Sequence, residues 1–65
     1  MKLFVWENVL HDYTEGVMFA LAPAVEDARK QLLVECSYIP EFDLSQEPKM
    51  YDMSSPVAFV MWGGG

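Results

Sequence analysis

Hydrophobic and polar positions alternate over the first third of the chain, and this alternation predicts a β-hairpin. Residues 2–10 are rich in the aromatic and β-branched side chains that strands prefer, and residues 17–22 alternate in the same way. Between them, residues 11–16 include Asp12 and Gly16, which favour a turn, and Gly16 can adopt positive φ without penalty. The first strand places apolar side chains on both faces, with Leu3, Val5 and Val9 on one face and Phe4 and Trp6 on the other.

The spacing of apolar positions then changes to that of a helix. Pro23 ends the second strand and is suited to the first helical position, and the helix is predicted to continue to about Cys36. Glu26 and Asp27 lie in the first turn, where carboxylates interact favourably with the helix dipole. The buried stripe is predicted to comprise Val25, Ala28, Leu32 and Cys36, widened by Leu33.

The second half of the chain is less regular. Residues 37–48 contain Pro40 and Pro48 and are expected to be irregular, with a short helical turn around 41–46. In this stretch we expect Phe42 and Leu44 to pack onto the core and Glu41, Asp43 and Glu47 to lie outside. A weak edge strand over 49–53, a tight turn over 54–56 and a strong strand over 57–62 complete the prediction.

These elements predict an α+β fold in the order ββαββ, with a mostly antiparallel four-stranded sheet and one helix packed on one face. Residues 1–65 are expected to form a single domain. One helix covers one face of the sheet, so we expect the other to be apolar and open unless residues 37–48 cover it. The open face is expected to hold Phe4, Trp6, Met18, Ala20, Ala58, Val60 and Trp62.

Composition supports the expectation of an uncovered apolar surface. Hydrophobic residues make up 52% of the chain, which is high for a domain with so much surface relative to its volume. The single cysteine excludes an internal disulfide, so stability must come from packing within or between chains. A homo-oligomer or a stable partner is therefore expected.

The charge balance limits the classes of partner. The net charge of −6 argues against direct binding to nucleic acid and against docking on anionic membranes. It permits binding to a basic protein surface, although acidic charge also keeps an apolar protein in solution. The early Glu7 and Asn8 interrupt any signal-peptide core, and no apolar run is long enough for a membrane span, so a cytoplasmic location is expected.

Few residues offer catalytic or ligand-binding chemistry, and we expect no enzyme activity, no cofactor and no metal site. His11 beside Asp12 is interpreted as a solvated turn rather than a catalytic pair, and one histidine with Cys36 cannot complete a zinc site. Candidate ligand contacts are aromatic side chains for stacking, cations for phosphate and a glycine tail whose amides can approach an anion. They are Trp6, His11, Tyr13, Trp62, Arg29 and Lys30, with Gly63, Gly64 and Gly65 as the tail.

The C-terminal glycines also resemble those of ubiquitin-like sulfur carriers, which are of similar length and end in Gly-Gly. Gly64 and Gly65 match that motif. The resemblance implies a carboxylate that a partner enzyme adenylates.

Over its full length the chain resembles, in style, small accessory proteins encoded by phages and prophages. The likeness is carried by Met-Lys-Leu-Phe-Val-Trp at the start, Asp-Tyr-Thr-Glu-Gly in the turn and Ala-Pro-Ala-Val-Glu-Asp-Ala-Arg at the helix entry. It implies a non-catalytic inhibitor of a host defence system in the host cytoplasm, which covers a protein surface or sequesters a nucleotide-like signal. A sulfur carrier and a structural or assembly subunit remain the alternatives.

Overall fold

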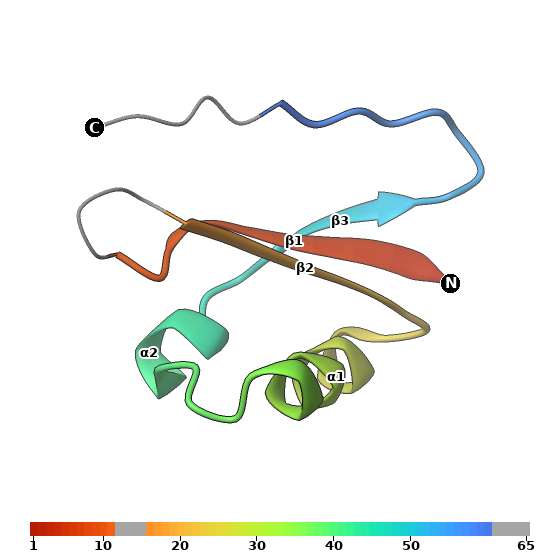
Figure 1. The fold of residues 1–65 in the computed structure, drawn as a ribbon. Helices are drawn as coiled ribbons and strands as arrows, with labels where there is room; N and C mark the ends of the chain where they lie inside the picture. The colour runs from red at the N-terminus through yellow and green to blue at the C-terminus, as the bar shows by residue number, and fades with distance from the viewer. Residues whose placement is uncertain (12–15, 61–65) are drawn as a thin grey trace.

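The computed structural model describes residues 1–11 and 16–60, and it has an α+β architecture (Figure 1). The elements follow in the order β1 (Lys2–Val9), β2 (Gly16–Ala22), α1 (Val25–Glu35), α2 (Glu41–Leu44) and β3 (Lys49–Asp52). The strands form an antiparallel sheet with the order β2-β1-β3. Within the described ranges, no helix has both the length and the apolar character needed to cross a bilayer.

The predicted hairpin is confirmed, and its register determines which side chains share a face. Phe4 pairs with Ala20 and Trp6 pairs with Met18, so these apolar side chains lie on one face of the sheet. This is the face that α1 covers, and both β1 and β2 contribute side chains to the main core there. The prediction that these residues form the open face was therefore wrong, because strand alternation defines two sets of side chains but does not show which set the helix covers.

A β-bulge near the end of β1 alters the alternation. The register shifts between Glu7 and Val9, and Asn8 has a φ of 56°. Asparagine is one of the few residues that adopt positive φ at low cost. Strict alternation predicts that Val9 lies on the same face as Leu3 and Val5. Because of the bulge, it lies instead in the main core.

The bulge also explains why position 16, which pairs with Val9, is a glycine. A Cβ at Gly16 would lie 3.0 Å from the Cβ of Leu10 and 3.1 Å from the carbonyl oxygen of Val9. The glycine is therefore required for the close approach of two backbones, and not for the positive φ that the turn pattern suggested. Positive φ occurs instead at Asn8 and Leu10, the latter with a φ of 55°.

Helix α1 is close to the predicted span but begins later. It begins at Val25 after an N-cap at Ala24, so Pro23 precedes the helix and is not its first residue. Ala28 and Leu32 are buried against the sheet, as the stripe predicts. Two expected members of the stripe differ: Leu33 is exposed, and Cys36 is the half-buried C-cap residue.

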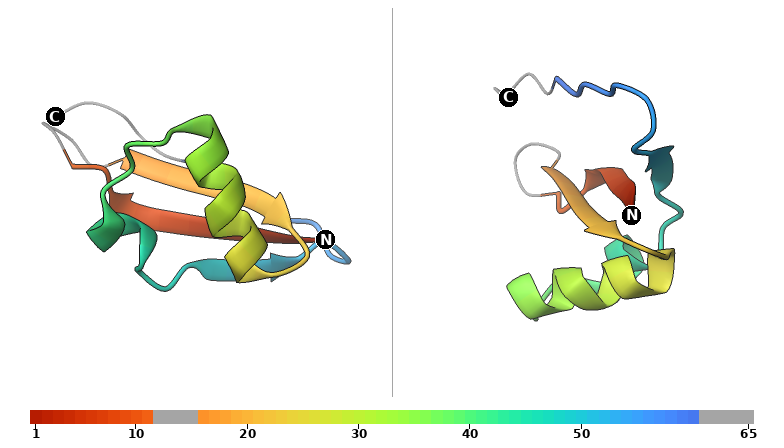
Figure 2. Two further views of the ribbon diagram at one scale, coloured as in Figure 1. Left: turned by 90° about the horizontal axis from the view of Figure 1, so that it is seen from below. Right: turned by 90° about the vertical axis from the view of Figure 1, so that its right-hand side faces the viewer.

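The segment after α1 packs on the same side of the sheet as α1 (Figure 2). Its short helix α2 confirms the expected helical turn. Leu44 packs against the core as predicted, but Phe42 is 76% exposed and Asp43 is buried, which reverses two expectations. Asp43 turns inward because its Oδ2 accepts a hydrogen bond of 3.3 Å from the backbone N–H of Leu10, beside the bulge.

The C-terminal part of the chain differs most from the prediction. β3 confirms the weak edge strand, and the N–H of Ser54 donates to Oδ1 of Asp52 in the turn that follows. Residues 57–60 then form neither helix nor strand, and Met61 and Trp62 lie outside the described residues. The fourth strand is thus not shown: residues 57–60 pass over the face of the sheet opposite the helices rather than joining an edge (Figures 1 and 2).

Candidate functional site

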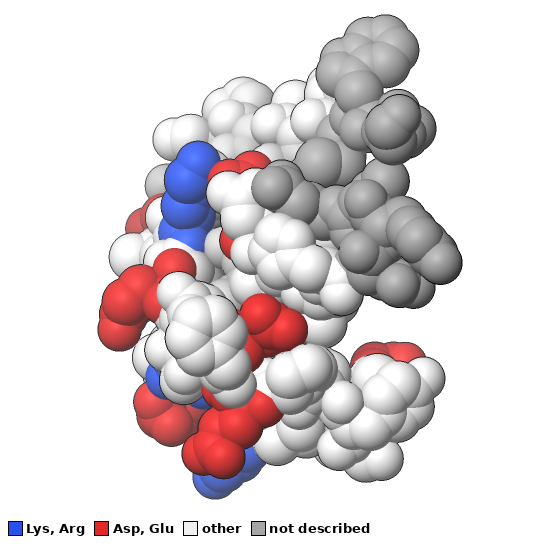
Figure 3. Space-filling model, turned by 90° about the vertical axis from the view of Figure 1, so that its left-hand side faces the viewer, with Lys and Arg blue, Asp and Glu red and all other residues white. Residues whose placement is uncertain are grey.

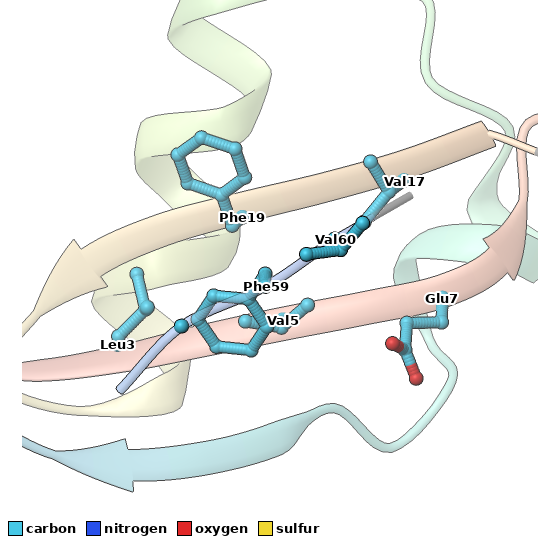
Figure 4. A pocket seen from close by; sticks show the side chains of 8 residues that line it. Leu3, Val5, Glu7, Val17, Phe19, Phe59 and Val60 are labelled. Carbon is cyan, nitrogen blue, oxygen red and sulfur yellow. The ribbon is translucent and has the colours of Figure 1, made fainter. Parts of the chain in front are cut away.

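The candidate site is an apolar cleft between the sheet and the segment that crosses it. Its volume is about 460 Å³. Its floor comes from β1 and β2, and its roof comes from residues 58–60 (Figure 4). The lining side chains are Leu3, Val5, Glu7, Val17, Phe19, Ala58, Phe59 and Val60.

The floor follows from the hairpin register. Val5 pairs with Phe19 and Glu7 pairs with Val17, so their side chains share the face opposite the core. Val5 is buried, with 4% of its surface exposed, whereas Phe19 is 64% exposed. The cleft is therefore closed over β1 and open toward β2.

An aromatic contact holds the roof against the third strand. The rings of Tyr51 and Phe59 meet edge to face, with centroids 5.0 Å apart and an interplanar angle of 83°. Tyr51 pairs with Leu3 across β1 and β3, which places it on the cleft side of the sheet. Edge-to-face pairs are favourable beyond their buried area, so this contact fixes where the segment crosses the sheet.

One end of the cleft is charged. Oε2 of Glu7 lies 3.0 Å from Nζ of Lys49, the first residue of β3. The hydrogen bond to the Glu7 carboxylate and its negative charge hold the pKa of Lys49 above its ordinary value. Glu7 is the charged member of the described lining, and none of that lining is cationic.

Two of the sequence-predicted ligand residues hold the fold together on the other side of the sheet. Trp6 is 1% exposed, and its indole N–H donates to the carbonyl of Gln46 at 2.8 Å. Arg29 donates from Nε to the carbonyl of Leu44 at 3.0 Å and from Nη2 to the same Gln46 carbonyl at 3.3 Å. Its Nη1 is 2.9 Å from Oε1 of Glu26. These contacts join β1, α1 and the end of α2.

The other predicted residues do not meet in one place. His11 is exposed, with Nε2 2.8 Å from the carbonyl oxygen of Asn8, and Lys30 is exposed on α1. Neither lines the cleft. The remaining candidates lie outside the described residues: Tyr13, Trp62, Gly63, Gly64 and Gly65.

Carboxylates outnumber cations on the face seen in Figure 3, mainly in the half that contains the helices. A second, more open hollow of about 350 Å³ lies there and includes Glu41 and Glu47 together with Arg29. Asp43, which was expected to lie outside with Glu41 and Glu47, is buried and does not add to these surface carboxylates. Across residues 1–11 and 16–60, no three His, Cys, Asp or Glu side chains are grouped as a metal ion requires.

Sequence reasoning missed the residues of the cleft, although it identified an apolar second face. The signal was present in Leu3, Val5, Val17 and Phe19, which alternate with the core residues. What the pattern did not contain is the path of residues 58–60. No family model matches the chain, and no curated protein and no solved structure does so either.

Proposed function

We propose that this chain is a non-catalytic binding protein whose apolar cleft receives an apolar side chain from the surface of a basic partner protein. The observation that carries the proposal is the cleft itself. Its volume of about 460 Å³ falls within the range of about 300–1,000 Å³ that is usual for ligand sites. It is lined by apolar side chains and has one polar end, a combination that excludes water while fixing orientation.

The charge of the chain supports a basic partner. The net charge of −6 attracts cationic surfaces over a distance of about one Debye length, roughly 8–10 Å at physiological salt. An apolar anchor in the cleft then supplies the contact that slows dissociation. This mechanism is occlusion: the partner's surface is covered without any chemical change. It suits the phage-type inhibitor of a host defence system that the sequence suggests.

Sequestration of a nucleotide-like signal has less support. Phosphate recognition requires cations, and the described lining contains none. Arg29 already donates to two carbonyl groups, and Lys49 is paired with Glu7. We therefore favour a protein as the ligand.

The proposal is tested by quantitative affinity capture from bacterial cytoplasm with a matched pair of variants. Val60 lines the cleft and is 80% exposed, whereas Val34 is 76% exposed on α1, so Val60→Glu and Val34→Glu add the same charge at positions of similar exposure. We expect a basic protein to be captured by the wild-type chain and by Val34→Glu, and its recovery to fall at least tenfold with Val60→Glu. Binding is then repeated with both proteins purified. Equal recovery of every captured protein by the two variants would exclude the cleft as the binding site.

A further inference from the structure

Strand β2 forms an outer edge of the sheet. In the strand order β2-β1-β3, and among the described residues, it pairs with β1 alone. Backbone groups in an antiparallel strand point alternately to its two sides. About half of the N–H and C=O groups of β2 therefore point away from β1, and these groups are able to pair with another strand.

The composition of β2 leaves this edge unprotected. Its residues, Gly-Val-Met-Phe-Ala-Leu-Ala, include no charged residue and no proline over a length of 7 residues. The opposite edge has the protection that natural sheets use. β3 has 4 residues, it follows Pro48, and it carries Lys49 and Asp52. Short length, proline and charge all discourage pairing, and β2 has none of them.

We propose that the outer edge of β2 pairs with the same edge of a second copy of this chain. The net charge of −6 makes two copies repel each other, so self-association requires a contact surface without charge, and β2 provides one. A strand also matches its own copy in length. The partner that best fits an uncharged edge on an acidic protein is therefore another copy.

Symmetry constrains this contact. Two identical edges pair in antiparallel fashion about a two-fold axis perpendicular to the sheet. Cross-strand partners point to the same face, so the axis passes midway between one residue of β2 and the same residue of the second copy. The longest overlap within Gly16–Ala22 has the axis at Phe19, which places Val17 opposite Leu21 of the partner subunit.

The arrangement extends the apolar face across both copies. Val17, Phe19 and Leu21 are at least 36% exposed in the single chain and lie on the face of the cleft. The axis keeps both pairs of helices on one side of the joined sheet and both clefts on the other. The contact therefore buries part of the apolar excess of the chain and places the clefts of both copies on the same face of the joined sheet.

The test combines the mass of the particle in solution with hydrogen exchange. Leu21 is 49% exposed and does not line the cleft, so Leu21→Lys adds a charge beside the edge, and Val34→Lys adds the same charge on α1 as the control. We expect native mass spectrometry and light scattering to show a dimer for the wild-type chain and for Val34→Lys. The dissociation constant of the Leu21→Lys dimer should be at least ten times that of the wild-type dimer. Its circular dichroism should remain that of the folded chain.

Hydrogen exchange then locates the contact. If the edges pair, the amides of β2 that point away from β1 exchange slowly in the wild-type dimer and rapidly in Leu21→Lys. A wild-type chain that is monomeric at high micromolar concentration would overturn the proposal. So would a dimer in which alternate β2 amides exchange rapidly, because such a dimer forms through another surface. A dimer lost on deletion of residues 57–65 but retained in Leu21→Lys would assign the contact to the C-terminal segment instead.

Discussion

Arg29 is expected to stabilise the fold by linking two segments, and its replacement by methionine gives a quantitative test. Methionine retains most of the apolar stem and removes the guanidinium. The change deletes the bonds to the carbonyls of Leu44 and Gln46 and the ion pair with Glu26. The stabilising role therefore depends on the sum of these three interactions.

The bond to Leu44 dominates that sum. It is short, at 3.0 Å, and partly buried, and a hydrogen bond from a charged donor contributes about 1.5–3 kcal/mol. The Gln46 bond is long, at 3.3 Å, and that carbonyl retains the indole N–H of Trp6. The Glu26 side chain is 74% exposed, so its ion pair contributes little. We expect Arg29→Met to lower the free energy of unfolding by about 2 kcal/mol, near the lower part of that range.

The matched control is Lys30→Met, at the next position of the same helix. It removes the same charge from an exposed side chain and is expected to change the free energy of unfolding by less than about 0.5 kcal/mol. In a domain of this size, about 1 kcal/mol shifts Tm by roughly 4–8 °C, so Arg29→Met should lower Tm by about 8–16 °C.

Thermal and urea unfolding followed by circular dichroism measure both variants. Protein concentration is held equal, because self-association would raise the apparent stability of whichever variant associates more. If the two variants unfold within about 0.5 kcal/mol of each other, Arg29 does not stabilise the fold as described. Arg29 would then again be a candidate for binding a ligand through its charge.

Three further outcomes are expected. Asn8→Val should lower the free energy of unfolding by about 1–2 kcal/mol, measured by urea unfolding, because a β-branched residue is strained at positive φ. A variant as stable as the wild-type chain would contradict the bulge at this position. Gly16→Ala should cost about 1–3 kcal/mol in the same assay, since its Cβ would lie 3.1 Å from a backbone carbonyl that cannot move aside easily; a more stable variant would show that the two backbones are not so close. The pKa of Lys49 is raised in the folded chain, so its pairing with Glu7 stabilises the fold at any pH below the unfolded pKa of about 10.5. This contribution is lost as the pH rises through the higher pKa of the folded chain. Glu7→Gln should bring the Lys49 pKa, followed by NMR of its Cε, back toward the ordinary value, and an unchanged titration would show that the pair does not form in solution.

The local elements could be predicted from the sequence because each has a periodicity of its own. Alternation over 17–22 identified β2, and the spacing of Ala28 and Leu32 identified α1. These patterns depend on neighbours within a few residues. They therefore give the element type but not its position to the residue, as the late start of α1 at Val25 shows.

The larger failures involve contacts between distant segments. Asp43 was expected outside because it is charged, but its partner is the amide of Leu10, 33 residues away. Val57 and its neighbours have the composition of a strand, yet composition does not show whether an edge is available to them. The candidate cleft depends on that same path, so an apolar second face could be predicted but its lining residues could not.

The carbonyl of Gln46 has a consequence for the order of folding during synthesis. It accepts from Trp6, 40 residues earlier, and from Arg29, 17 residues earlier. The hairpin and α1 are built from local contacts and form quickly, whereas contacts between distant residues close more slowly. A chain still growing on the ribosome has no partner for the Trp6 indole until residue 46 has emerged. We therefore expect the first two strands and the helix to stay loosely associated until that late residue arrives and joins them.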